Sequence, residues 1–192
     1  MVKPLQIGIT GGIGAGKSLI CRIFHCLGIP VYDADGHAKE LMTTDVILIS
    51  NIKKEFGELS YNTDGTLNRN YLSSAVFDDS EKLSKLNSLV HPQVGADYNR
   101  WVEIHRNYPY VMKEAALLLD KVIVVHAPEE LRIQRVIARD SHRSKDQVRA
   151  IMSKQMPEAQ KMKKADFIII NDEKDLVVPQ VLELHNRFLS IV

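Results

Sequence analysis

The sequence has little of what would mark a disulfide-stapled or metal-clustered protein. Only two of its 192 residues are cysteines, Cys21 and Cys26. On a helix their five-residue spacing turns them about 140° apart, so we expect no structural disulfide and no cysteine metal site. Scarce cysteine is typical of proteins in a reducing compartment, and we expect this chain in the cytoplasm.

Long apolar runs and an excess of one charge are missing as well. No stretch approaches the roughly 18 apolar residues that span a bilayer, and the short N-terminal apolar run turns glycine-rich, unlike a signal peptide. Lysine and arginine number 25 and acidic residues 24, a formal net charge of +1. We therefore expect neither a membrane nor a nucleic acid as partner. The sequence leaves the oligomeric state open.

What is present is an alternation of strand-like and helix-like segments. Strands are predicted over residues 5–10, 29–33, 110–112, 122–125 and 167–170. Such strands, interleaved with helices, favour an α/β fold with about five mostly parallel strands covered on both faces. Residues 36–108 show no strand pattern and are predicted to be a helical insertion. Within it, Pro92 is expected to open a helix, since proline suits a first turn.

The segment after the first predicted strand carries the strongest functional signal. It fits the pattern G-x-x-x-x-G-K-[ST] in full and opens a predicted helix, with the residues Gly11, Gly12, Ile13, Gly14, Ala15, Gly16, Lys17 and Ser18. Glycines let backbone N–H groups converge on phosphate oxygens, and the helix N-terminus adds partial positive charge. Lys17 would bind the β- and γ-phosphates and Ser18 a Mg²⁺ ion. We therefore expect a nucleoside triphosphate here, with the adjoining Leu19 beside it.

Two aspartates follow the second predicted strand. Because parallel strands end at the same edge of a sheet, Asp33 is expected beside the phosphate loop. There its carboxylate could accept a proton from an attacking hydroxyl or help position Mg²⁺, but it could also cap the next helix. We favour function for Asp33 and capping for Asp35. The D-x-x-G pattern at 33–36 is interpreted as accidental, because no guanine-reading segment accompanies it.

A basic segment lies toward the C-terminus. Residues 132–164 contain ten lysines and arginines against three acidic residues. Arg135 and Arg139 share a helix face and could clamp transferring phosphates, although a solvated basic surface is an equal alternative. His91, Glu114 and Asn171 are lesser candidates with structural alternatives; Asn171 ends the last strand, where it could contact a base or ribose.

These features recur, in this order, in one family. Besides the phosphate loop they are Asp33-Ala34-Asp35, Asp64-Gly65, Asn68-Arg69, Val76-Phe77, Leu86, His91-Pro92, Val94, Gln134-Arg135, Arg139-Asp140, Gln155, Ala165-Asp166 and Asn171. The chain thus resembles the dephospho-CoA kinase family over nearly its whole length. The resemblance implies ATP-dependent phosphorylation of the ribose 3′-hydroxyl of dephospho-CoA, the last step of coenzyme A synthesis. ATP, dephospho-CoA and Mg²⁺ are its implied substrates and cofactor.

The resemblance also implies a division of labour along the chain. A P-loop NTPase-type α/β/α sandwich would bind the nucleotide through residues 1–35, 109–131 and 165–192. Residues 36–108 would bind the acceptor, and residues 132–164 would form a small helical lid. Asp33 would act as base toward the 3′-hydroxyl, with Lys17 and Arg139 on the phosphates.

Further residues match the family's positions near its ligands. The resemblance places Arg135 and Asn171 with the nucleotide, and Arg69 and His91 with the acceptor. Two departures stand out. Leu19 replaces the family's usual threonine, and a loop is missing between Leu118 and Leu119. Either that loop is deleted or the sequence omits it; we favour omission, in which case a site carboxylate is missing too.

Two other functions fit parts of the sequence. A kinase for another nucleotide-like or nucleoside acceptor would keep the phosphate loop, Asp33 and the basic lid, and would differ only in its acceptor. A nucleotide-gated binding protein with slow hydrolysis would keep the loop alone, but the sequence lacks a base-reading segment for it. The pattern as a whole favours the small-molecule kinase.

Overall fold

A computed structural model describes residues 3–77, 79–114 and 119–191. The chain forms two compact units, one of residues 1–33 with 104–192 and one of residues 34–103. The interrupted first unit contains the sheet, and the second is helical. The nucleotide and acceptor roles predicted for them remain predictions. The departure between Leu118 and Leu119 borders residues outside the described part of the chain.

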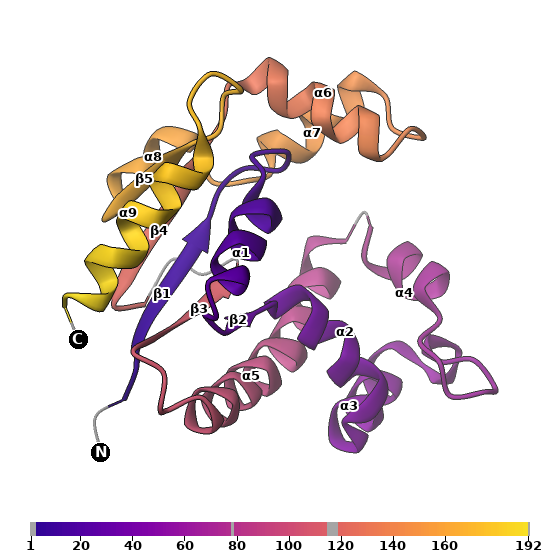
Figure 1. The fold of residues 1–192 in the computed structure, drawn as a ribbon. Helices are drawn as coiled ribbons and strands as arrows, with labels where there is room; N and C mark the ends of the chain where they lie inside the picture. Colours follow the sequence, from indigo (N-terminus) through magenta and orange to yellow (C-terminus); the bar gives the residue numbers. More distant parts are fainter. Residues whose placement is uncertain (1–2, 78, 115–118, 192) are drawn as a thin grey trace. The chain divides into compact units, whose positions relative to one another are not determined.

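The first unit is built on one parallel sheet (Figure 1). Its strands are β1 (Leu5–Thr10), β2 (Val31–Tyr32), β3 (Tyr110–Glu114), β4 (Lys121–His126) and β5 (Phe167–Ile170), in the spatial order β2-β3-β1-β4-β5. The predicted parallel sheet is confirmed. The second strand is shorter than predicted, because Pro30 has no N–H to donate; only its carbonyl pairs, accepting from the Met112 N–H at 2.9 Å.

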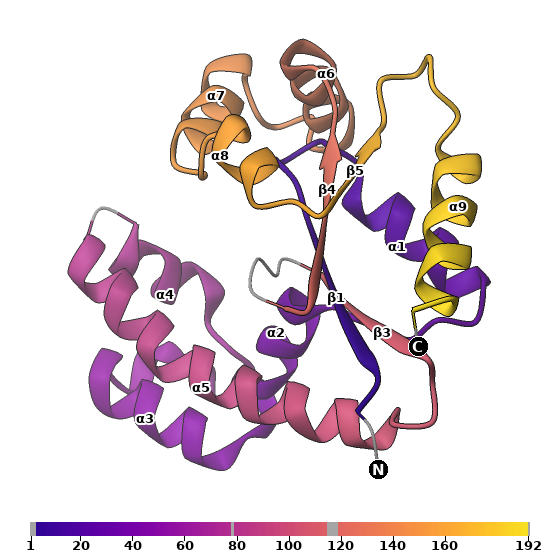
Figure 2. The ribbon, with the colours of Figure 1, turned by 90° about the vertical axis from the view of Figure 1, so that its left-hand side faces the viewer.

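Helices cover this sheet on both sides. Helices α1 (Lys17–Cys26) and α9 (Val177–Leu189) lie side by side on one face, and α8 (Glu158–Lys163) lies on the other (Figure 2). Ile9, Ile20 and Phe24 are fully buried between sheet and helices. Burial of these large apolar side chains holds the helices against the sheet. The carboxyl ends of the strands are thereby held in place.

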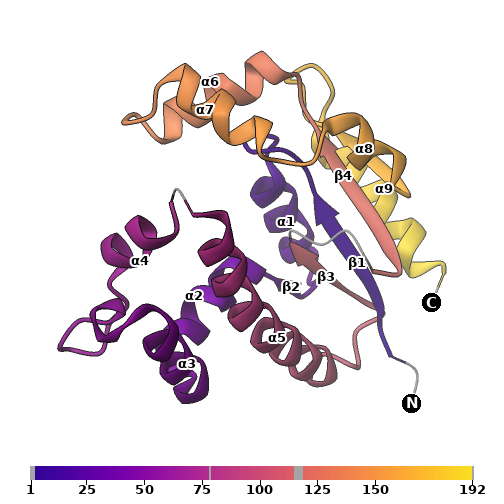
Figure 3. The same cartoon turned by 180° about the vertical axis from the view of Figure 1, so that it is seen from behind.

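A pair of helices lies beyond the carboxyl ends of β1 and β4 (Figure 3). These are α6 (Glu129–Arg139) and α7 (Lys145–Ser153). They pack through a small core of Ile133, Val136 and Val148, against which Ile13 of the phosphate loop also rests. Ser144 and Gln147 form a capping box at the start of α7. The segment expected as a lid is thus seated directly on the loop.

The second unit is helical, as predicted. It contains α2 (Ala34–Thr44), α3 (Val46–Phe56), the 3₁₀ turn η1 (Glu58–Ser60), α4 (Arg69–Val76) and most of α5 (Ser80–Ile104). The helix start expected at Pro92 is wrong, because Pro92 lies inside α5. Val90, Val94 and Tyr98 bury one face across that point, and this packing outweighs the lost backbone hydrogen bond. Within the described ranges, no helix is long and apolar enough to cross a membrane.

Candidate active site

The phosphate loop connects the end of β1 to the start of α1. Gly16 has φ 94°, a left-handed conformation that glycine adopts without strain. The Asn171 Nδ2 donates to the Ala15 carbonyl at 2.9 Å, and the Lys17 ammonium donates to the Gly11 carbonyl at 3.2 Å. Asn171, at the end of β5, therefore holds the loop at Ala15, and the Lys17 side chain reaches back to Gly11. This shape suits an anion at the N-terminus of α1.

We expect Gly16→Ala to destabilise the protein more than Gly28→Ala. Both glycines have positive φ, 94° and 82°, where alanine costs about 1–2 kcal/mol. A Cβ at Gly16 would also overlap with the Asn171 amide, whereas nothing lies within 4 Å of a Cβ at Gly28. Urea unfolding should show the larger loss for Gly16→Ala, together with weakened ATP binding. An equal loss of stability in the two variants would mean that the Asn171 side chain can move away from the new Cβ without an energetic penalty.

A cavity of about 550 Å³ opens beside the loop and brings several predicted site residues together. It is lined by Ser18, Cys21, Arg22, His25, Val31, Asp33, Glu114 and Arg139, and we call it the Asp33 cavity. Asp33 follows β2 directly and Glu114 ends β3, so both carboxylates come from strand ends, as parallel topology requires. The Ser18 hydroxyl donates to Glu114 Oε1 at 3.3 Å.

The thiol of Cys21 responds to the charges of this cavity. Burial raises its pKa to about 12; the Glu114 carboxylate adds to the rise, Lys17 opposes it and Asp33 adds a smaller part. Cys21 therefore stays a protonated thiol and is no nucleophile at neutral pH. The same pattern indicates that two carboxylates and one ammonium act on a single small region.

The two arginines expected on the phosphates are placed differently. Arg139 lines the Asp33 cavity, with its side chain 65% exposed and both oxygens of Asp140 bound at 2.9 and 3.0 Å. Arg135 instead donates to the Asn171 carbonyl at 3.0 Å and to Glu173 at 3.1 Å. Here Arg135 ties α6 to the chain after β5, and through Asn171 to the phosphate loop.

The loop also contacts residues that were not predicted as site residues. Arg132 is only 8% exposed, and its guanidinium lies so close to Gly12 that a Cβ there would overlap with it. Gln155 Oε1 accepts from the Ile13 N–H at 3.0 Å. Glu158 pairs with Arg132 at 3.1 Å and lies 2.9 Å from His126 Nδ1. The family pattern could have indicated Gln155, which belongs to it. No sequence signal distinguished Arg132 from the other nine basic residues of 132–164.

The remaining predicted residues do not gather in one place. Leu19 lies in the first turn of α1 and is 40% exposed. Within the helical unit, Arg69 lines a cavity of about 230 Å³ formed by α2, α4 and α5. His91 is exposed on α5 and is not among the residues that line this cavity.

Comparison with known proteins finds one family. The family model described as dephospho-CoA kinase matches residues 5–176. A dephospho-CoA kinase of Bacteroides fragilis is 33% identical over 188 residues, covering 94% of this chain and 91% of the relative. Among solved structures, TT1252 from Thermus thermophilus has a TM-score of 0.83 at 32% identity, with 97% and 98% of the two chains covered.

A second solved structure carries the family's name. The dephospho-CoA kinase of Campylobacter jejuni has a TM-score of 0.66 at 25% identity, covering 95% of this chain and 96% of its own. The family model spans most of the 192 residues, including the phosphate loop, Asp33 and the basic segment. This chain belongs to the dephospho-CoA kinase family.

Proposed function

We propose that this protein transfers the γ-phosphoryl group of ATP to the ribose 3′-hydroxyl of dephospho-CoA, giving coenzyme A and ADP. The observation that carries the proposal is the Asp33 cavity. It joins the start of α1, where the phosphate loop ends, to a carboxylate and an arginine that the chain could use on an incoming alcohol. Family membership supplies the acceptor.

In this reaction each side chain has a separate task. The 3′-oxygen attacks the γ-phosphorus, the bond from phosphorus to the β,γ-bridging oxygen breaks, and ADP leaves. Asp33 accepts the hydroxyl proton or aligns the hydroxyl for attack. Lys17 and Arg139 offset the negative charge that develops on the phosphoryl oxygens. The backbone N–H groups of the loop hold the phosphates in place.

The oxygen atoms around Ser18 fit a Mg²⁺ ion. Its hydroxyl and the Glu114 carboxylate lie 3.3 Å apart, and both are hard oxygen ligands. Among the described residues no group of three His, Cys, Asp or Glu side chains could hold a metal. This suits Mg²⁺, which is usually held by few protein oxygens together with phosphates and water. When bound, the ion neutralises charge on the β- and γ-phosphates.

The helical unit is proposed to bind the acceptor. Arg69 lines its cavity together with Lys39, and the apolar side chains of Leu72 and Leu86 complete the wall. Cations suit the pyrophosphate of dephospho-CoA and apolar walls suit its organic chain. His91 is proposed as a further acceptor contact from its position in the family pattern.

A coupled assay of ADP release tests the function. With ATP and Mg²⁺ present, dephospho-CoA should accelerate ADP formation well above the rate without acceptor, and mass spectrometry should show one added phosphoryl group. Nucleoside monophosphates serve as comparison acceptors. Turnover with one of them but not with dephospho-CoA would identify a different kinase, and tight ATP binding without any acceptor turnover would indicate a nucleotide-gated binding protein.

A further inference from the structure

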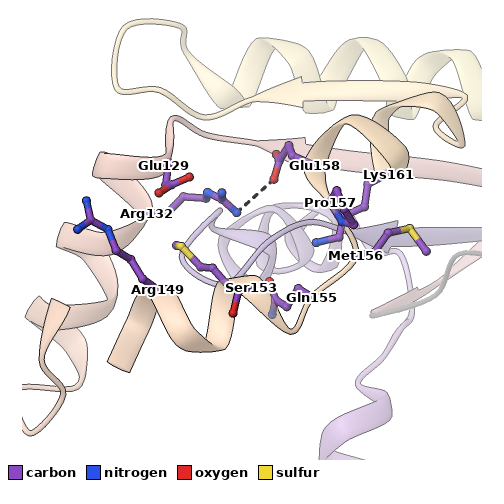
Figure 4. Close-up of a pocket in the computed structure, with 10 residues that line it drawn as sticks. Glu129, Arg132, Arg149, Ser153, Gln155, Met156, Pro157, Glu158 and Lys161 are labelled. Atoms are coloured by element: carbon purple, nitrogen blue, oxygen red, sulfur yellow. Dashed lines mark ion pairs between the residues drawn. The ribbon is translucent and has the colours of Figure 1, made fainter. Parts of the chain in front are cut away.

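A second cavity, of about 400 Å³, lies beside the phosphate loop. Its walls come from α6, α7, α8 and the chain between the last two, and include Arg132, Arg149, Gln155, Met156, Glu158 and Lys161. We call it the Lys161 cavity. Figure 4 shows the Arg132–Glu158 ion pair within it and the Lys161 side chain beside that pair. The proposed mechanism gives none of these side chains a task.

The acidic group of this cavity is already engaged on both its oxygens. Glu158 Oε2 binds Arg132 at 3.1 Å, and Glu158 Oε1 lies 2.9 Å from His126 Nδ1. Each oxygen thus has one partner, and the single negative charge of Glu158 is shared between Arg132, His126 and any further cation nearby. It therefore fixes Arg132 against the loop at Gly12 without neutralising the remaining positive charge nearby.

Lys161 is the cation of this cavity that the Arg132–Glu158 ion pair does not include. The residue is only 6% exposed, and within the described ranges its ammonium makes no hydrogen bond and has no carboxylate at ion-pair distance. Burial lowers the pKa of Lys161; Glu158 opposes this, and repulsion from Arg132 and Lys17 adds to it. A buried ammonium is unfavourable unless an anion accompanies it. Among the described residues, the carboxylate that acts on Lys161 is that of Glu158, and it is already paired with Arg132 and His126.

The neighbours of Lys161 show where that anion would be. Arg132, which lines the same cavity, lies against Gly12 of the phosphate loop. Gln155, in the same cavity wall, binds the Ile13 N–H of the loop. The Lys161 cavity is therefore adjacent to the phosphate loop and shares no lining residue with the Asp33 cavity.

We propose that Lys161 is a further phosphate-binding residue, which with Lys17 holds the polyphosphate chain of ATP from the lid side. The inference rests on the proposed kinase function and deepens it. Lys161 neither gives nor accepts a proton in the transfer. It binds phosphate oxygens that stay negatively charged throughout the transfer, so its loss should act mainly on ATP binding.

The test compares Lys161→Met with Lys163→Met, a charge loss of the same size at an exposed position of the same helix. Calorimetric titration should show ATP binding weakened about tenfold or more by Lys161→Met, since a hydrogen bond to a charged group is lost. AMP, which lacks the β- and γ-phosphates, should bind both variants alike. Lys161→Arg should keep most of the ATP affinity, and Lys163→Met should resemble the unchanged protein.

Stability without nucleotide separates this role from a structural one. Lys161→Met removes a buried, repelled cation, so urea unfolding of the nucleotide-free protein should require as much urea as before or more. ATP should then add less stabilisation than it adds to the unchanged protein. Unaltered ATP affinity, or an equal loss for ATP and AMP, would overturn the inference. If Lys161→Met does not fold, Lys161→Gln carries the same comparison.

The outcomes also separate this inference from the proposed function. Dephospho-CoA turnover by the unchanged protein together with normal ATP binding by Lys161→Met would refute the role of Lys161 and leave the kinase function standing. Absence of turnover together with Lys161-dependent ATP binding would refute the acceptor and leave the phosphate-binding role standing.

Discussion

Asp33→Asn should lower kcat for dephospho-CoA phosphorylation by about 10²–10⁴-fold, the usual contribution of a positioned general base. The asparagine amide has nearly the same size as the carboxylate but accepts no proton. Asp33 is exposed to the Asp33 cavity rather than buried in the core, so the fold should survive the change. ATP affinity should change little, because the phosphates are held by the loop. Steady-state kinetics with calorimetric ATP titration separates the two effects.

Asp35→Asn is the matched control. It removes the same charge two residues further on, in the first turn of α2, outside the group of residues that line the Asp33 cavity. We expect its kcat to remain within a few-fold of the unchanged protein. A near-normal rate for Asp33→Asn would remove this residue from the chemistry and direct attention to Glu114, the other carboxylate of the cavity.

Local features of this protein were readable from its sequence. The phosphate loop was predictable because eight consecutive residues carry the whole requirement: glycines for the turn, then Lys17 and Ser18 at fixed positions. The capping box of Ser144 and Gln147 is equally local. The position of Asp33 needed one further step, since the parallel topology places the ends of β1 and β2 at a common edge.

Features that depend on distant partners were not readable. Nothing near Arg132 in the sequence distinguishes it from the other basic residues of 132–164, because its role depends on Gly12 and on Glu158. Lys161 differs from the exposed Lys163 only by the side of α8 on which it lies. Charge counting finds such a segment, but only packing tells which of its cations is buried.

Pro92 failed as a prediction for a related reason. A proline rule describes the local cost of a missing N–H, whereas α5 is held by apolar side chains on both sides of that point. Asp79 caps the start of α5, because its carboxylate accepts from the backbone N–H groups of Glu81 and Lys82. Tertiary packing therefore decided the length of this helix, and the Asp79 side chain caps its start.

Arg139→Met should lower kcat by about 10²–10³-fold, the cost of losing one donor to a developing oxyanion. The guanidinium binds Asp140 and is 65% exposed, so binding a phosphoryl oxygen would require it to exchange this partner. Such an exchange gains most when the charge on that oxygen is greatest, which is in the transition state. The loss should therefore appear in kcat, with ATP affinity changed only a few-fold.

Arg143→Met tests whether the effect belongs to the cavity or to the Asp140 cluster. Arg143 also pairs with Asp140, at 3.3 Å, but it is not among the residues that line the Asp33 cavity. Its loss should leave kcat nearly unchanged, and Arg139→Lys should restore only part of the rate, because lysine lacks the planar two-donor fork. If the two arginine substitutions lowered kcat equally, Arg139 would act by holding Asp140 and the end of α6. Lys17 and Lys161 would then have to offset the charge on the phosphoryl group without Arg139.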